Sequence, residues 1–168
     1  MFNKKPDFKH LFVVATGFWR TSQMIAGHMS NKHDFSVISS YFTNLSFAGE
    51  VYLKCLLLLR TETLLHGHNL KELYDKQIEI DRVEIEQAYK KEIERSAVFK
   101  AMKSKNPKVD LELLSTLEEV GNAFVAWRYL YEERPPQART LSAFVDVLPK
   151  HILNIDPGLK SFTTTILP

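Results

Sequence analysis

The segment from Phe47 to Lys76, FAGEVYLKCLLLLRTETLLHGHNLKELYDK, constrains the fold more than any other part of the chain. Its first half is almost wholly apolar, and a helix that is apolar on every side is usually buried inside a protein. Glu50 and Lys54 interrupt this apolar run one helical turn apart. Because buried charges are costly unless they are paired, we expect these two side chains to belong to a polar layer between helices.

The remaining sequence also has helical periodicity, with apolar residues at spacings of three and four almost throughout. The pattern predicts an all-α fold, an up-and-down bundle of four long helices with one or two short extra helices. The long helices are expected at about 7–28, 36–65, 81–103 and 110–133, and the short ones at 69–75 and 141–153. The length of 168 residues fits one domain, with a core at about 7–135 and a C-terminal helix and tail at 136–168.

The charge and cysteine content limit the classes of partner. The chain has 22 basic and 20 acidic residues, a net charge of +2, so a nucleic acid would have to bind a local basic patch. Cys55 is the only cysteine, which excludes a disulfide framework within the chain and fits a cytoplasmic protein. We expect a buried thiol there, no metal site, no cofactor, and no membrane span of ~20 apolar residues.

A second informative segment is NAFVAWRYLYEERPP, at the end of the expected fourth long helix. Arg128 extends an apolar stripe of this helix, and a guanidinium placed there needs an anionic partner or a carbonyl. One interpretation is a structural ion pair with Glu50 or Glu132. The other is a phosphate contact in a groove between helices.

Taken together, these segments resemble the HEPN family of helical domains over residues 10–135. The first shared motif, A-x-E-x-x-x-K-x-L-L, comprises Ala48, Glu50, Lys54, Leu57 and Leu58. The second, a Gly-His turn followed by a helix, comprises Gly67, His68, Leu70 and Leu73. The third, on the late helix, comprises Phe124, Trp127, Arg128, Tyr129, Tyr131 and Glu132. The resemblance implies a helical bundle, frequent homodimerisation, and roles in RNA cleavage, RNA or nucleotide association, toxin–antitoxin systems or phage defence.

The sequence departs from the ribonuclease members of that family. Their motif has an Arg followed after four to six residues by a His, but Tyr, Leu, Tyr, Glu, Glu, Arg, Pro and Pro follow Arg128. We therefore expect a non-catalytic module that binds RNA, a nucleotide or a protein partner. The ligand-binding candidates are Glu50, Lys54, His68, Arg128 and Glu132.

Two alternatives remain open at this point. The first is a metal-independent RNA-cleaving enzyme with a rearranged site, formed by Arg128 with Tyr131, Glu132 or a His from elsewhere. The second is a purely structural dimerisation module. Separately, Lys100, Lys103, Lys105 and Lys108 form a local basic patch, which fits either a solvated helix end or a phosphate contact.

Overall fold

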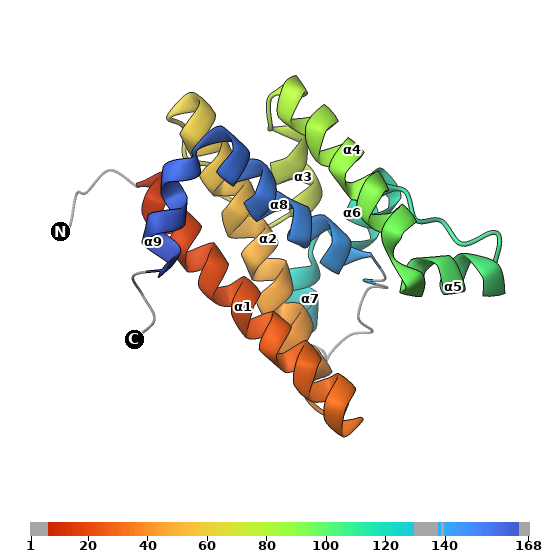
Figure 1. Cartoon of the computed structure of the whole chain (residues 1–168). Coiled ribbons are helices and arrows are strands. Elements are labelled where there is room, and N and C mark those ends of the chain that lie inside the picture. The colour runs from red at the N-terminus through yellow and green to blue at the C-terminus, as the bar shows by residue number, and fades with distance from the viewer. Residues whose placement is uncertain (1–6, 130–137, 139, 165–168) are drawn as a thin grey trace.

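The computed structural model describes residues 7–129, 138 and 140–164, and all regular structure in these residues is helical (Figure 1). The all-α class is therefore confirmed. The elements are α1 Phe8–Lys32, α2 Ile38–Thr61, α3 Leu70–Asp75, α4 Glu79–Arg95, α5 Ala97–Lys105, α6 Leu113–Val120, α7 Ala123–Arg128, α8 Leu141–Ile155, the 3-10 helix η1 Pro157–Leu159, and α9 Lys160–Thr164.

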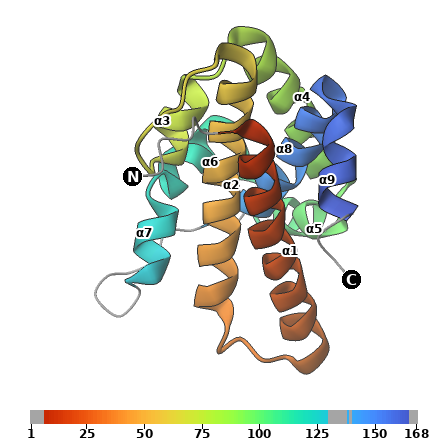
Figure 2. The same cartoon turned by 90° about the vertical axis from the view of Figure 1, so that its left-hand side faces the viewer.

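The two longest helices, α1 and α2, form an antiparallel hairpin whose tip extends below the other helices (Figure 2). Asp7 begins α1 as its N-cap, because its side chain accepts a hydrogen bond from the backbone N–H of Lys9. His33 ends α1 in the left-handed conformation, with φ of 51°. These two helices correspond to the first two of the four long helices that the sequence predicts.

Helix α2 lies at the centre of the core, with α1, α3, α7 and α8 packed around it. Leu45, Leu53 and Leu56 have no exposed surface, and Gly49 lets α8 approach closely. A Cβ atom at Gly49 would lie 3.1 Å from a methyl group of Val145. By length and composition α2 could also cross a membrane, but 67% of its most apolar window is buried in the protein, as in the core helix of a soluble protein.

The prediction of four long helices is not confirmed, because the third and fourth are each interrupted. Ser96 has extended backbone and separates α4 from α5, and its hydroxyl caps α5 by accepting a hydrogen bond from the N–H of Phe99. Gly121 and Asn122 separate α6 from α7. The bundle therefore has two long helices and a set of shorter ones around them.

The segment that was predicted as a C-terminal helix contributes to the middle of the core. Phe144, Leu148 and Ile152 of α8 have no exposed surface. A buried polar network also joins α8 to α2 and α4. Asp81 accepts two hydrogen bonds from Arg60, at 2.8 and 3.1 Å, and lies 2.9 Å from Nε2 of His151. These contacts connect three helices through one carboxylate.

Candidate functional site

The candidate site begins with the carboxylate of Glu50, which is 1% exposed in the middle of α2. Nζ of Lys54 lies 2.8 Å from Oε1 of Glu50, and its side chain is 14% exposed. Residues four apart lie on the same face of a helix, so the predicted i, i+4 pair forms as expected. The ion pair compensates a charge that would be costly to bury alone.

A second partner of Glu50 comes from the loop between α2 and α3. Nδ1 of His68 lies 3.0 and 3.1 Å from the two carboxylate oxygens of Glu50. The carboxylate can only accept, so Nδ1 of His68 carries the proton and donates. The His68 side chain is 59% exposed, so much of the ring is open to solvent.

The His68 loop is held in place by a close backbone contact with the break between α6 and α7. The N–H of Leu70 donates to the carbonyl of Gly121 at 2.8 Å. Asn69 caps α3 by accepting from the N–H of Glu72, and a Cβ atom at Gly121 would lie 2.9 Å from the Asn69 amide. Gly67 takes the positive φ of 104° that the turn requires. The same contact therefore fixes both the loop and the start of α7.

Helix α7 brings an aromatic ring and a cation to His68. The ring centroid of Phe124 lies 6.0 Å from that of His68, and the guanidinium of Arg128 lies 5.1 Å from the Phe124 centroid. Phe124 also stacks on Phe47 of α2 at 4.8 Å. Arg128 is exposed. We call Glu50, Lys54, His68, Phe124 and Arg128 the Glu50 cluster.

The Glu50 cluster contains four of the five ligand-binding residues that the sequence predicts. Glu50, Lys54 and His68 are directly bonded, and Arg128 joins them through Phe124. An ion pair of Arg128 with Glu50, one of the interpretations that the sequence left open, does not form: the carboxylate bonds Lys54 and His68, and the guanidinium lies over Phe124 at the surface. The other candidates, Tyr131 and Glu132, lie outside the described residues.

This arrangement is suited to an anionic ligand that also has a flat ring. A guanidinium presents several N–H donors to phosphate or carboxylate oxygens, and Arg128 is exposed beside Phe124. Aromatic rings stack on nucleobases without sequence preference. A histidine whose Nδ1 is held by a buried carboxylate presents Nε2 for hydrogen bonding or proton transfer.

Two sets of interactions were not predicted from the sequence. In the sequence Phe124 belongs to an apolar stripe and to the family motif, and neither pattern predicts that it forms the contact between His68 and Arg128. The network around Asp81 was not predicted, because its partner His151 lies 70 residues away. The sequence did contain a signal, since Asp81, Ile85 and Tyr89 recur at a spacing of four, which places the acid on the same helix face as two apolar side chains, and all three are buried in α4.

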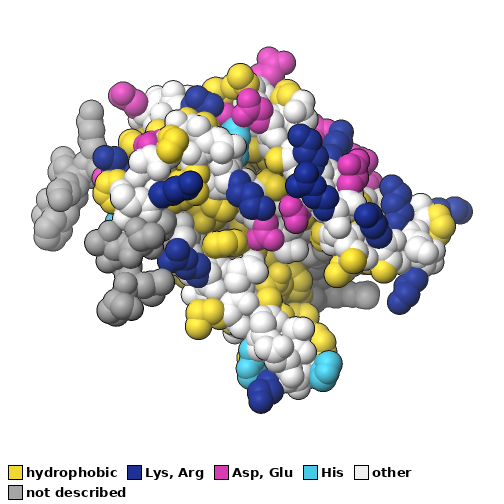
Figure 3. Space-filling view, viewed as in Figure 1, with side chains coloured by type: hydrophobic (Ala, Val, Ile, Leu, Met, Phe, Trp, Pro, Cys, Tyr) yellow, Lys and Arg dark blue, Asp and Glu magenta, His cyan; other side chains and the backbone are white. Residues whose placement is uncertain are grey.

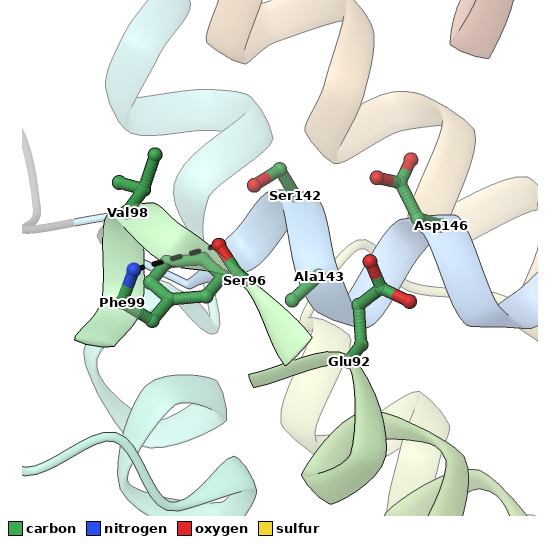
Figure 4. Close-up of a pocket in the computed structure, with 7 residues that line it drawn as sticks. All are labelled: Glu92, Ser96, Val98, Phe99, Ser142, Ala143 and Asp146. Carbon is green, nitrogen blue, oxygen red and sulfur yellow. Dashed lines mark hydrogen bonds between the residues drawn. The ribbon is translucent and has the colours of Figure 1, made fainter. Parts of the chain in front are cut away.

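Two open pockets lie away from the Glu50 cluster, and none of its residues lines either one. The pocket in Figure 4, of about 240 Å³, lies between α4, α5 and α8 and has Glu92, Phe99 and Asp146 among its lining residues. Burial raises the pKa of the Asp146 carboxyl above its ordinary value, and the hydrogen bond from Nε1 of Trp19, at 2.7 Å, opposes that shift.

Neither a metal-binding arrangement of side chains nor a similar known protein indicates a role for the chain. In residues 7–129, 138 and 140–164, no group of three His, Cys, Asp or Glu side chains is arranged to hold a metal ion. Comparison with protein-family models, curated proteins and solved structures finds no match. The Glu50 cluster is therefore the main structural indication of a function.

Proposed function

We propose that this chain is a non-catalytic module that binds RNA or a nucleotide at the Glu50 cluster. The observation that carries the proposal is the exposed His68 ring, fixed by buried Glu50 and flanked by Phe124 and exposed Arg128. In this proposal Arg128 binds a phosphate, the exposed ring of His68 contacts a base, and Nε2 of His68 completes the polar contact.

The cost of building this cluster supports a role beyond holding the helices together. Nδ1 of His68 bonds a carboxylate that has 2% of its side chain exposed, while the ring itself remains 59% exposed. A histidine needed only for packing would be expected to bury its ring. Exposed Arg128 adds a cation that the ion pair of Glu50 with Lys54 does not require.

Equilibrium binding of a short single-stranded RNA, followed by fluorescence anisotropy, tests the proposal. Truncating a hydrogen-bonding charge should weaken binding about tenfold or more, so Arg128→Ala and His68→Ala should each bind more weakly than the natural protein. Lys32→Ala serves as the control, because Lys32 is an exposed cation at the end of α1. Equal affinity of all four proteins would overturn the proposal. Displacement of the RNA by a mononucleotide would show that a single nucleotide is enough to occupy the site.

A second candidate function, metal-independent RNA cleavage, is favoured by one observation. The pair of Glu50 and His68 has the arrangement in which a carboxylate orients a histidine for acid–base catalysis, and Arg128 could stabilise charge on phosphate. This version predicts cleavage in the presence of a metal chelator, lost in His68→Ala and reduced in Glu50→Gln. Intact RNA at high protein concentration would exclude it.

The biological setting and the assembly are also proposals. The sequence motifs resemble those of HEPN domains, which supports a role in bacterial stress, toxin–antitoxin or phage-defence systems, with a homodimer or another protein as partner. The competing structural role makes a distinct prediction. If the Glu50 cluster only fixes helix packing, Arg128→Met should fold and bind RNA or any protein partner as the natural protein does. Sedimentation analysis of the purified chain tests the homodimer.

A further inference from the structure

A second charged surface lies on α5, outside the Glu50 cluster. Five cations occur between Arg95 and Lys108, and no acidic residue occurs in this segment. The whole chain has a net charge of only +2, so this short segment is far more basic than the rest of the protein. The five cations are Arg95, Lys100, Lys103, Lys105 and Lys108.

All five cations are exposed, and none forms an ion pair with any other residue that the structure describes. Some lysines elsewhere are paired on their own helix, as half-buried Lys71 is with Asp75 and exposed Lys90 with Glu86. The positive charge of α5 is therefore uncompensated, and its field extends into solvent.

The local structure separates α5 from the bundle. The break at Ser96 turns the chain away from α4, and α5 projects from one end of the molecule (Figure 1). Phe99 is its only buried residue and Met102 is half-buried, so two side chains attach the helix and the rest face solvent. A nine-residue helix is about 14 Å long, so Lys100, Lys103 and Lys105 lie within that length of one another along its axis.

The basic surface continues from α5 onto α4 and α8. Lys91 and Arg95 of α4 and Lys150 of α8 line an open pocket of about 220 Å³. Figure 3 shows Lys and Arg side chains gathered over α4 and α5 on this face. Glu84 and Glu92 also line this pocket, and Glu92 lies 3.9 Å from Lys150, so the uncompensated charge is concentrated on α5.

The composition of α5 selects among anionic partners. A helix that binds a membrane surface buries a continuous apolar face in the lipid. The large apolar side chains of α5, Phe99 and Met102, pack against the protein instead, and Val98 is its only strongly exposed large apolar residue, at 66%. The four lysines of α5 and of the segment after it are instead suited to a ligand that carries a row of regularly spaced negative charges, such as phosphates. No exposed aromatic ring lies on α5 to stack on bases.

We propose that α5 and the segment after it form a docking surface for the phosphodiester backbone of single-stranded RNA, bound through Lys100, Lys103, Lys105 and Lys108 without sequence preference. The surface shares no residue with the Glu50 cluster, so the inference deepens the proposed function but can be tested apart from it. Each lysine that neutralises a phosphate releases a counterion and makes binding weaker as salt rises.

The test measures RNA affinity against salt for a variant with all four lysines changed to Gln. Four phosphate contacts to a single strand should contribute about −2.8 to the slope of log affinity against log salt concentration. A slope of that size lowers the affinity about 50-fold between about 50 and 200 mM salt. That contribution should disappear in the variant. The matched control changes four lysines on other elements and has the same net charge: Lys9→Gln, Lys32→Gln, Lys76→Gln and Lys160→Gln.

The outcomes separate the two surfaces. A slope that falls in the α5 variant and not in the control supports the inference. Equal slopes in the natural protein and the α5 variant overturn it, as does an equal fall in the control variant, since only net charge would then matter. Binding to anionic phospholipid vesicles but not to RNA also overturns it. A variant with both His68→Ala and Arg128→Ala should keep the α5 contribution to the slope, even if the Glu50 cluster proves not to bind RNA.

Discussion

The buried pair of Glu50 and Lys54 allows a prediction in which a second substitution repairs the damage of the first. Lys54→Met leaves the Glu50 carboxylate 1% exposed with only His68 as a partner. Removing one member of a buried ion pair typically costs 3–5 kcal/mol, and we expect about 3 kcal/mol, because His68 retains part of the interaction. Adding Glu50→Gln removes the unpaired charge and should restore about 2 kcal/mol of stability.

Urea denaturation followed by circular dichroism measures these differences. With a urea dependence of about 2 kcal/mol per molar, Lys54→Met should lower the midpoint by about 1.5 M, and the double variant should recover most of that loss. Lys71→Met is the control, because Lys71 and Asp75 have the same i, i+4 spacing at the surface and should cost under about 0.5 kcal/mol. A double variant that is less stable than Lys54→Met would refute the reasoning.

Three further predictions concern other parts of the molecule. Gly121→Ala places a Cβ atom 2.9 Å from the Asn69 amide, and in thermal unfolding it should lower the stability by about 1 kcal/mol through loss of the α3 cap. The control Gly17→Ala, whose Cβ atom would have nothing within 4 Å, should leave the stability unchanged or raise it. Asp81→Asn removes a buried, doubly paired carboxylate and should cost about 3 kcal/mol in urea denaturation; a cost as small as that of a surface pair would contradict this. Burial raises the pKa of the Cys55 thiol to about 12, so a thiol reagent at about pH 8 should label the protein only after unfolding, and rapid labelling of the native protein would show that Cys55 is accessible.

Local patterns in the sequence predicted the elements whose causes are local. The apolar run of α2 required burial, and the spacing of Glu50 and Lys54 required that they share a helix face. Asn69, a residue type preferred at helix N-termini, caps α3. Cys55 is buried, as its place in an apolar run indicated.

The features that sequence analysis missed depend on contacts between distant segments. Gly121 continued an apolar stripe in sequence, but its carbonyl accepts from Leu70, and this contact accompanies the break between α6 and α7. A continuous helix would carry Arg128 along its apolar stripe toward the core, whereas the separate α7 leaves it exposed over Phe124. The pairing of Asp81 with His151 likewise requires α4 and α8 to meet.

The most direct test of the central claim is a map of backbone amide shifts by nuclear magnetic resonance while a short single-stranded RNA is titrated into the labelled protein. The account predicts that the shifted amides include those around His68 and those of α7 from Phe124 to Arg128, which form the Glu50 cluster. Shifts confined to other surfaces, α5 included, or no shifts at saturating RNA would contradict the assignment of the Glu50 cluster as the binding site.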